Sequence, residues 1–198
     1  MRLFDEHIKR KRFLLDGIWD FVTDENDIGE KENWNINFPS DSMQVTVPSC
    51  INNRFGYMQF QSVAWYKKEF YAEGFISIKF NAVTEYAKVY LDGEYLGDHY
   101  GGFTAFEFDK QVEVGKHTLI VRVDSKSTKD TIPLWEVDWH HYCGIIRSVE
   151  VSCFTSVAIK SMRCEYELSE DLKNKIRTLT RTYGRLCWQW QKELDEKN

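Results

Sequence analysis

Apolar and polar residues alternate along most of the chain, as they do in strands that bury one face. The clearest runs are Trp19–Phe21, Met43–Val47, Ile76–Phe80, Ala87–Leu91 and Leu119–Val123. A period of two is typical of half-buried antiparallel strands, and its recurrence at short intervals predicts a β-sandwich or a barrel. Asp92-Gly93 follows one of these runs as a hairpin turn signal. Because no convincing helical period appears before about Val151, we expect an all-β body.

The last forty residues carry a different pattern. Alternation continues from Met162 to Leu168, which predicts one more strand. Beyond Ser169, a plausible N-cap, the apolar residues recur every three or four positions and predict a helix over 169–194. They are Leu172, Ile176, Leu179, Tyr183, Leu186 and Trp190. We expect this segment to be a helix packed on its own domain or a loosely ordered end; the alternative is an assembly element that pairs with a second copy or a partner.

Length and composition narrow the choice of protein class. The chain has 198 residues, of which 42% are hydrophobic and 29% charged, and this balance argues against disorder. Aromatic residues reach 15%, which favours strands. No apolar run approaches the roughly 18 residues of a membrane helix. A TIM barrel, which needs roughly 250 residues, cannot fit in this chain.

Charge and cysteine content bear on partners and location. Lys and Arg number 26 against 31 Asp and Glu, so the net charge is −5 and neither nucleic acid nor an anionic membrane is an expected partner. The one basic cluster, Lys9–Arg12, is interpreted as a solvated start of a strand. Five cysteines without a CxxC pair favour reduced thiols. With no secretory signal visible, we expect a cytoplasmic protein.

Three clusters of motifs, in order along the chain, carry a family resemblance. The first is LDGIWDF (15–21), VPS (47–49) and WYKKEF (65–70); the second is FNAVTEYAKVYLDG (80–93) with HYGGFTAF (99–106); the third is TIP (131–133) and DWHHYCGIIRSV (138–149). Together they resemble the N-terminal sugar-binding domain of glycoside hydrolase family 2, of the β-glucuronidase or β-galactosidase kind. The resemblance implies a jelly-roll sandwich of the galactose-binding-domain type.

The resemblance also implies a domain order. Residues 1–14 would form an N-terminal arm, 15–153 the jelly-roll domain, and 157–198 the truncated start of an immunoglobulin-like second domain that ends in the helical tail. In this family a later TIM barrel carries the two catalytic glutamates of a retaining β-glycosidase. We therefore expect no catalytic residue and no activity in this chain alone. The alternative is a free-standing carbohydrate-binding module, and the intact enzyme could form oligomers.

Asp138 is the main candidate site residue. The resemblance implies that it reaches toward the barrel pocket and accepts hydrogen bonds from hydroxyls of a terminal β-glycoside, a task suited to a carboxylate with two oxygens. Trp135 and Trp139 flank it and could stack on sugar C–H faces, although a scaffold role is the stronger reading for each. The substrate-binding prediction is thus Asp138, Trp139 and Trp135.

Other residues in the third cluster have simpler interpretations. His140, His141 and Cys143 lack a second ligand pair at zinc spacing, so no metal and no cofactor is predicted. A Cys–His nucleophile is not supported by any third group. Gly101-Gly102 predicts a tight turn or a close approach to another strand, and Gly144 a bulge or turn. Arg147 is expected to anchor a neighbouring carboxylate.

Overall fold

The computed structural model describes residues 10–129, 131, 138, 140–154, 161–165 and 179–183. The strands in this part are β1 (Arg10–Leu14), β2 (Gly17–Asp24), β3 (Met43–Val47), β4 (Val63–Phe80), β5 (Val83–Thr84), β6 (Tyr86–Leu91), β7 (Glu94–Tyr100), β8 (Phe106–Asp124), β9 (Gly144–Ile145), β10 (Val149–Phe154), β11 (Ser161–Glu165) and β12 (Leu179–Tyr183). A single short 3₁₀ helix, η1 (Ile51–Asn53), accompanies them in the described residues. The chain divides into two compact units, Met1–Cys153 and Phe154–Asn198.

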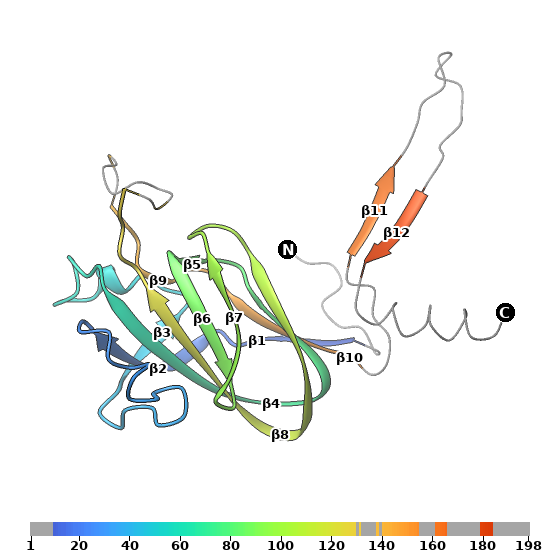
Figure 1. Ribbon diagram of the computed structural model, residues 1–198, viewed down its shortest axis with the longest axis horizontal. Helices are drawn as coiled ribbons and strands as arrows, with labels where there is room; N and C mark the ends of the chain where they lie inside the picture. Colours follow the sequence, from blue (N-terminus) through green and yellow to red (C-terminus); the bar gives the residue numbers. More distant parts are fainter. Residues whose placement is uncertain are drawn as a thin grey trace, which may run out of the picture. The chain divides into compact units, whose positions relative to one another are not determined.

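The first unit is built on one eight-stranded sheet and a two-stranded pair. In the large sheet the strands follow the order β1-β10-β4-β8-β6-β7, and β2 adds to β4 and carries β3 on its other side. The short strands β5 and β9 pair antiparallel apart from this sheet. Figure 1 shows β4 and β8 as two long curved strands that run through the whole unit. These two strands therefore connect all the other strands of the sheet.

Strand β4 has one neighbour along its whole length and another only at its beginning. Its beginning pairs with β2, from Asp20↔Lys67 to Asp24↔Val63, while its whole length pairs with β8. The β4–β8 register shifts between Ala72 and Gly74, where Gly74 has a φ of +75°. A bulge of this kind bends a strand and increases its twist. The bend lets β4 and β8 stay paired along their length, while the beginning of β4 also pairs with β2.

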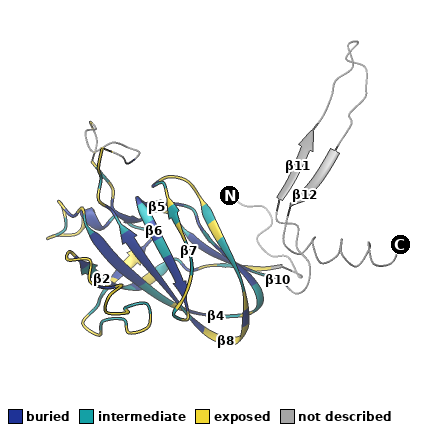
Figure 2. Ribbon diagram, in the orientation of Figure 1, coloured by how far each residue is buried: buried dark blue, intermediate teal, exposed yellow. Residues whose placement is uncertain are grey.

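A large apolar core fills the space enclosed by the curved sheet. Many of its fully buried side chains come from the alternating runs found in the sequence, and Figure 2 shows the buried positions along the inner strands. The largest members are Trp19, Phe21, Phe80, Ile51, Ile76, Ile78, Leu119 and Ile145. Trp19 buries its indole N–H by donating to the Leu15 carbonyl at 2.8 Å, so the polar atom is satisfied.

A smaller cluster lies on the opposite side of the same strands. Val63, Trp65, Tyr90 and Ile120 form it, and the segment 25–42 contributes Trp34 and Phe38. Asp24 fixes the start of this segment, because its carboxylate accepts hydrogen bonds from the main-chain N–H groups of residues 28 and 29 at 2.8 Å. It also accepts the indole N–H of Trp65 at 3.0 Å. The segment 25–42 thus covers the part of the outward face that carries Trp65, Tyr90 and Ile120.

The expectation of an all-β body is confirmed. Each of the five alternating runs lies in a strand: β2, β3, β4, β6 and β8. Asp92 and Gly93 form the turn between β6 and β7, with φ values of +51° and +82°. This conformation is the one that an Asp-Gly hairpin turn requires. In the described part of the chain, no helix is long and apolar enough to cross a membrane.

The helix expected over 169–194 is wrong where the structure describes that range. Residues Leu179–Tyr183 form β12, which pairs antiparallel with β11 from Glu165↔Leu179 to Ser161↔Tyr183. Leu179 and Tyr183 are four residues apart, an even spacing that places them on one face of a strand as well as of a helix. The threonines at 180 and 182 are β-branched and favour the extended form. Residues 169–178 and 184–194 lie outside the described residues.

One residue of the basic cluster at the N-terminus, Arg12, has a more specific contact than expected. Arg12 lies in β1, and its guanidinium forms an ion pair with Glu150 of β10. The Glu150 side chain is only 3% exposed, so the pair joins a surface strand to a buried carboxylate. A buried charge needs such a partner. Lys11 and Arg12 are exposed at the start of β1, as expected, and Arg12 in addition has a structural role.

Candidate functional site

The segment between β8 and β9 carries the predicted sugar contact. Asp138 is exposed there, as a residue that meets a ligand would be. Trp135 and Trp139 lie outside the described residues, so their stacking role stays a prediction. The structure therefore places one of the three predicted residues on an accessible surface and leaves their mutual arrangement open.

The two ends of this segment are held firmly by β5 and by the residues before β4. At the beginning, Ser125 donates its hydroxyl to the Thr84 carbonyl at 2.8 Å and its main-chain N–H to the Ser62 carbonyl at 3.1 Å. At the end, Gly144 pairs with Thr84 in the β5–β9 ladder. Both ends therefore converge on Thr84, which is 1% exposed.

Cys143 is part of this anchor. Its main-chain N–H donates to Asn52 Oδ1 at 2.9 Å, and its thiol approaches the Phe60 carbonyl at 3.0 Å. Burial raises the pKa of the Cys143 thiol to about 11. Because the thiolate is the reactive form of cysteine, this residue is unsuited to nucleophilic chemistry.

The two histidines of the motif have separate neighbours. His141 Nδ1 lies 3.1 Å from the Ser127 hydroxyl, which links the two ends of the Asp138 segment. The His140 ring meets the Tyr142 ring edge-on, with ring centroids 5.9 Å apart. No group of three or more His, Cys, Asp or Glu side chains that could hold a metal ion occurs in the residues that the structure describes.

Glu85 is a site residue that sequence reasoning missed. It follows Thr84 directly, is 4% exposed, and its carboxylate lies against Gly102. Its Oε2 atom has no hydrogen-bond partner among the described residues. Burial raises the pKa of Glu85, although the nearby His141 and the Gly102 N–H oppose this effect. The signal in the sequence was a lone acidic residue within the otherwise uncharged stretch 80–87.

The glycine expectations are confirmed. Gly101 has a φ of +130°, and a Cβ at Gly102 would lie 3.0 Å from both Glu85 Oε2 and Thr84 Cγ2. At Gly144 φ is +115°, and a Cβ would lie 2.6 Å from the Tyr66 hydroxyl. A side chain would strain the backbone at Gly101 and Gly144, and a Cβ would meet a close neighbour at Gly102 and Gly144. The 101–102 turn and β9 are thereby packed close to β5 and β4.

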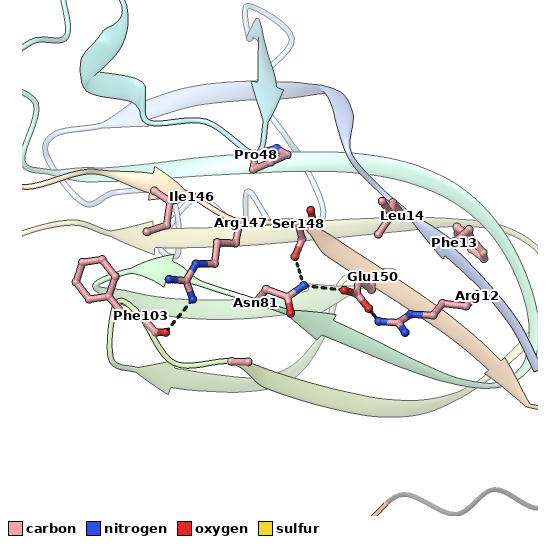
Figure 3. A pocket seen from close by; sticks show the side chains of 11 residues that line it. Arg12, Phe13, Leu14, Pro48, Asn81, Phe103, Ile146, Arg147, Ser148 and Glu150 are labelled. Atoms are coloured by element: carbon pink, nitrogen blue, oxygen red, sulfur yellow. Dashed lines mark hydrogen bonds and ion pairs between the residues drawn. The ribbon is translucent and has the colours of Figure 1, made fainter. Parts of the chain in front are cut away.

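Arg147 does not have the carboxylate partner expected for it. Its Nη1 donates to the main-chain carbonyl of Phe103 at 3.4 Å, and none of the described carboxylates pairs with it. Arg147 is exposed and borders a groove of about 810 Å³ between β1, β10 and the loops at 81, 103–105 and 146–148 (Figure 3). The groove joins polar and apolar side chains in one concave surface.

The comparisons with known proteins agree with this all-β architecture. A β-glucuronidase from Ruminococcus gnavus, solved in complex with uronic isofagomine, matches with a TM-score of 0.75 and 24% identity. The match covers 83% of this chain and 32% of that chain. It shows the fold: the described body is an all-β domain of the kind that occurs in β-glucuronidases.

Sequence comparison identifies the protein family to which the chain is related. The β-galactosidases of Thermoanaerobacter pseudethanolicus and Thermoanaerobacterium thermosulfurigenes are 29% and 30% identical to it over 167 and 173 residues. These stretches cover 77% and 79% of this chain but only 22% and 23% of the two relatives. The family model described as "Glycosyl hydrolases family 2, sugar binding domain" matches residues 59–154. The chain belongs to glycosyl hydrolase family 2 through this N-terminal sugar-binding domain.

Proposed function

We propose that this chain supplies the sugar-contacting domain of a family 2 β-glycosidase, an enzyme that hydrolyses terminal β-glycosidic bonds. The observation that carries the proposal is the family match over 59–154, which includes β4 through β10 and the segment with Asp138. The similar β-galactosidases and β-glucuronidase support the reaction class. The ligand is accordingly a carbohydrate.

We extend the proposal to the type of sandwich and to the domain order, using the same family match. Residues 15–153 form a jelly-roll sandwich of the galactose-binding type, and 157–198 form the start of a second, immunoglobulin-like domain. The bent β4–β8 pair and the enclosed core support the sandwich. The β11–β12 hairpin supports a second domain that begins with strands.

Asp138 is the residue of this domain that contacts the sugar. Its exposure and the firm anchors at Ser125 and Cys143 support this role, because a side chain that binds a ligand needs a fixed base. The carboxylate accepts hydrogen bonds from two sugar hydroxyls. A hydrogen bond to a charged group contributes about 1.5–3 kcal/mol. Trp135 and Trp139 complete the contact surface.

The test is turnover with and without Asp138. Protein expressed from the complete gene is assayed with 4-nitrophenyl β-D-glucuronide and β-D-galactoside, and Asp138→Ala should lower kcat/KM about ten- to a hundredfold. Asp41→Ala, at another exposed aspartate, is the control and should leave kcat/KM unchanged. The 198-residue chain alone should show no turnover. Enzyme-level rates from that chain, or a fully active Asp138→Ala enzyme, would contradict the proposal.

A further inference from the structure

The groove beside Arg147 combines the groups that recognise a charged sugar. Its volume of about 810 Å³ is within the range of roughly 300–1,000 Å³ that is common for ligand sites. Figure 3 shows Arg147, Asn81, Ser148 and Glu150 along it, with Phe103 at one end. None of these residues belongs to the segment that carries Asp138.

The guanidinium of Arg147 is the free cation of the groove among the described residues. It makes one long hydrogen bond, of 3.4 Å, to the neutral Phe103 carbonyl. A guanidinium has five N–H donors in a planar fork that fits a carboxylate. Most of its donors are therefore available to a ligand.

The second cation of the groove is already neutralised. Arg12 forms an ion pair with the buried Glu150, whose carboxylate also accepts the Asn81 amide at 2.9 Å. Among the described residues that line the groove there are two cations and one anion, so this lining has a net positive charge. This balance favours an anionic ligand near Arg147.

Asn81 offers the complementary acceptor. Its amide nitrogen donates to the Ser148 carbonyl and to Glu150, both at 2.9 Å, which fixes the orientation of the side chain. The amide oxygen accepts no hydrogen bond from the described residues, so it remains available to a hydroxyl group. A fixed acceptor near a cation suits a ligand with both hydroxyls and a carboxylate.

Apolar side chains supply the third feature of the groove that suits a sugar. Phe103 is 45% exposed, and Leu14, which also lines the groove, is 52% exposed. An exposed aromatic face can stack on the C–H face of a sugar ring. The groove therefore has a cation, an acceptor and an apolar platform for one small polyhydroxylated molecule.

We infer that this groove is a second saccharide-binding site, specific for a sugar that carries a carboxylate, such as a terminal uronic acid. Arg147 binds the carboxylate, Asn81 accepts a ring hydroxyl and Phe103 packs on the ring. The site needs neither Asp138 nor a catalytic domain, so it stands independently of the function proposed above.

The experiment is calorimetric titration of the full 198-residue chain with methyl β-D-glucuronide, methyl β-D-glucoside and acetate. We expect saturable binding of the glucuronide, with at least tenfold weaker binding of the uncharged glucoside and of acetate. Arg147→Met should weaken glucuronide binding about ten- to a hundredfold, and Phe103→Ala should weaken it as well. Both residues are exposed, so neither variant threatens the fold.

Arg54→Met is the matched control. Arg54 is another exposed arginine whose Nη1 donates to one main-chain carbonyl, that of Gln44 at 2.8 Å, but it lies outside the groove. Its replacement should leave glucuronide binding unchanged. Equal binding of glucuronide and glucoside, equal binding of glucuronide and acetate, absence of binding, or an equal effect of the two arginine variants would each overturn the inference. Loss of binding in Asp138→Ala would instead assign the affinity to the proposed substrate contact.

Discussion

Gly102 lies directly against the buried carboxylate of Glu85, because a Cβ at position 102 would lie 3.0 Å from Oε2 of that carboxylate. The glycine thus allows the turn after β7 to pack directly on an acidic side chain that is 4% exposed. Because Thr84, the residue before Glu85, anchors both ends of the Asp138 segment, this contact links two loops at one end of the sheet.

Glu85→Gln should change how stability depends on pH. Burial raises the pKa of Glu85 above its ordinary value of 4.5, so the folded protein holds this proton more tightly than the unfolded chain does. The resulting stabilisation is fully present below about pH 4.5 and is lost as the pH rises through the folded-state pKa. Glutamine cannot ionise, so the variant should gain stability relative to the parent protein as the pH rises.

Urea unfolding between pH 4 and pH 8 measures this effect. Glu25→Gln, at an exposed acidic residue, is the control and should follow the parent curve. A constant difference between Glu85→Gln and the parent protein at every pH would show that Glu85 does not titrate across this range.

His117 and Asp92 should form a second pH-dependent contact. Burial of the His117 ring disfavours its charged form, but hydrogen bonds to Asp92 at 2.7 Å and to the Glu113 carbonyl at 2.9 Å outweigh this and raise its pKa. The stabilisation is fully present below the ordinary pKa of 6.5 and is lost as the pH rises through the folded-state pKa.

Asp92→Asn should therefore lower the pKa of His117 and cost more stability at pH 5.5 than at pH 8.5. Asparagine tolerates the φ of +51° at this turn position, so the fold should be kept. NMR titration of the His117 ring protons measures the pKa. His99, whose ring contacts Thr104 rather than an acid, serves as the internal control. An unchanged His117 titration would rule out the ion pair as the cause.

Gly144→Ala should destabilise the protein by roughly 2–4 kcal/mol. The φ of +115° strains an alanine, and its Cβ would lie 2.6 Å from the Tyr66 hydroxyl and 3.4 Å from the Ser49 carbonyl. Gly115→Ala is the control, since nothing lies within 4 Å of a Cβ there. Equal denaturation midpoints for the two variants would contradict this account.

Cys143 should resist alkylation in the folded protein. Its thiol is 1% exposed, and burial raises its pKa to about 11, so the reactive thiolate is scarce at pH 8. Iodoacetamide labelling followed by peptide mass spectrometry should modify Cys143 only after urea is added. The half-buried Cys50 is the comparison within the same sample and should be labelled sooner. Rapid labelling of Cys143 without urea would show that this anchor opens.

The alternation of apolar residues was enough to predict the all-β body, because one buried face imposes a period of two. Trp19 and Phe21, Ile76 and Ile78, and Val121 and Val123 all point into the core as the pattern indicates. The same reasoning failed at Leu179 and Tyr183, because a spacing of four residues fits one face of a helix as well as one face of a strand. The pairing with β11 settled the outcome, and no local pattern contains that information.

For the candidate sites, the family resemblance carried by the sequence pointed to Asp138. The sequence also predicted a tight turn or close approach at Gly101-Gly102 and a bulge or turn at Gly144. Only the tertiary structure decided that Glu85 is a buried carboxylate under Gly102, and that Asn81, Phe103 and Arg147 border one groove. These residues come from loops up to 66 positions apart in the sequence, as Asn81 and Arg147 are. Residue type and spacing determine what a side chain can do, but the strand pairings of β4, β8 and β10 decide which side chains meet.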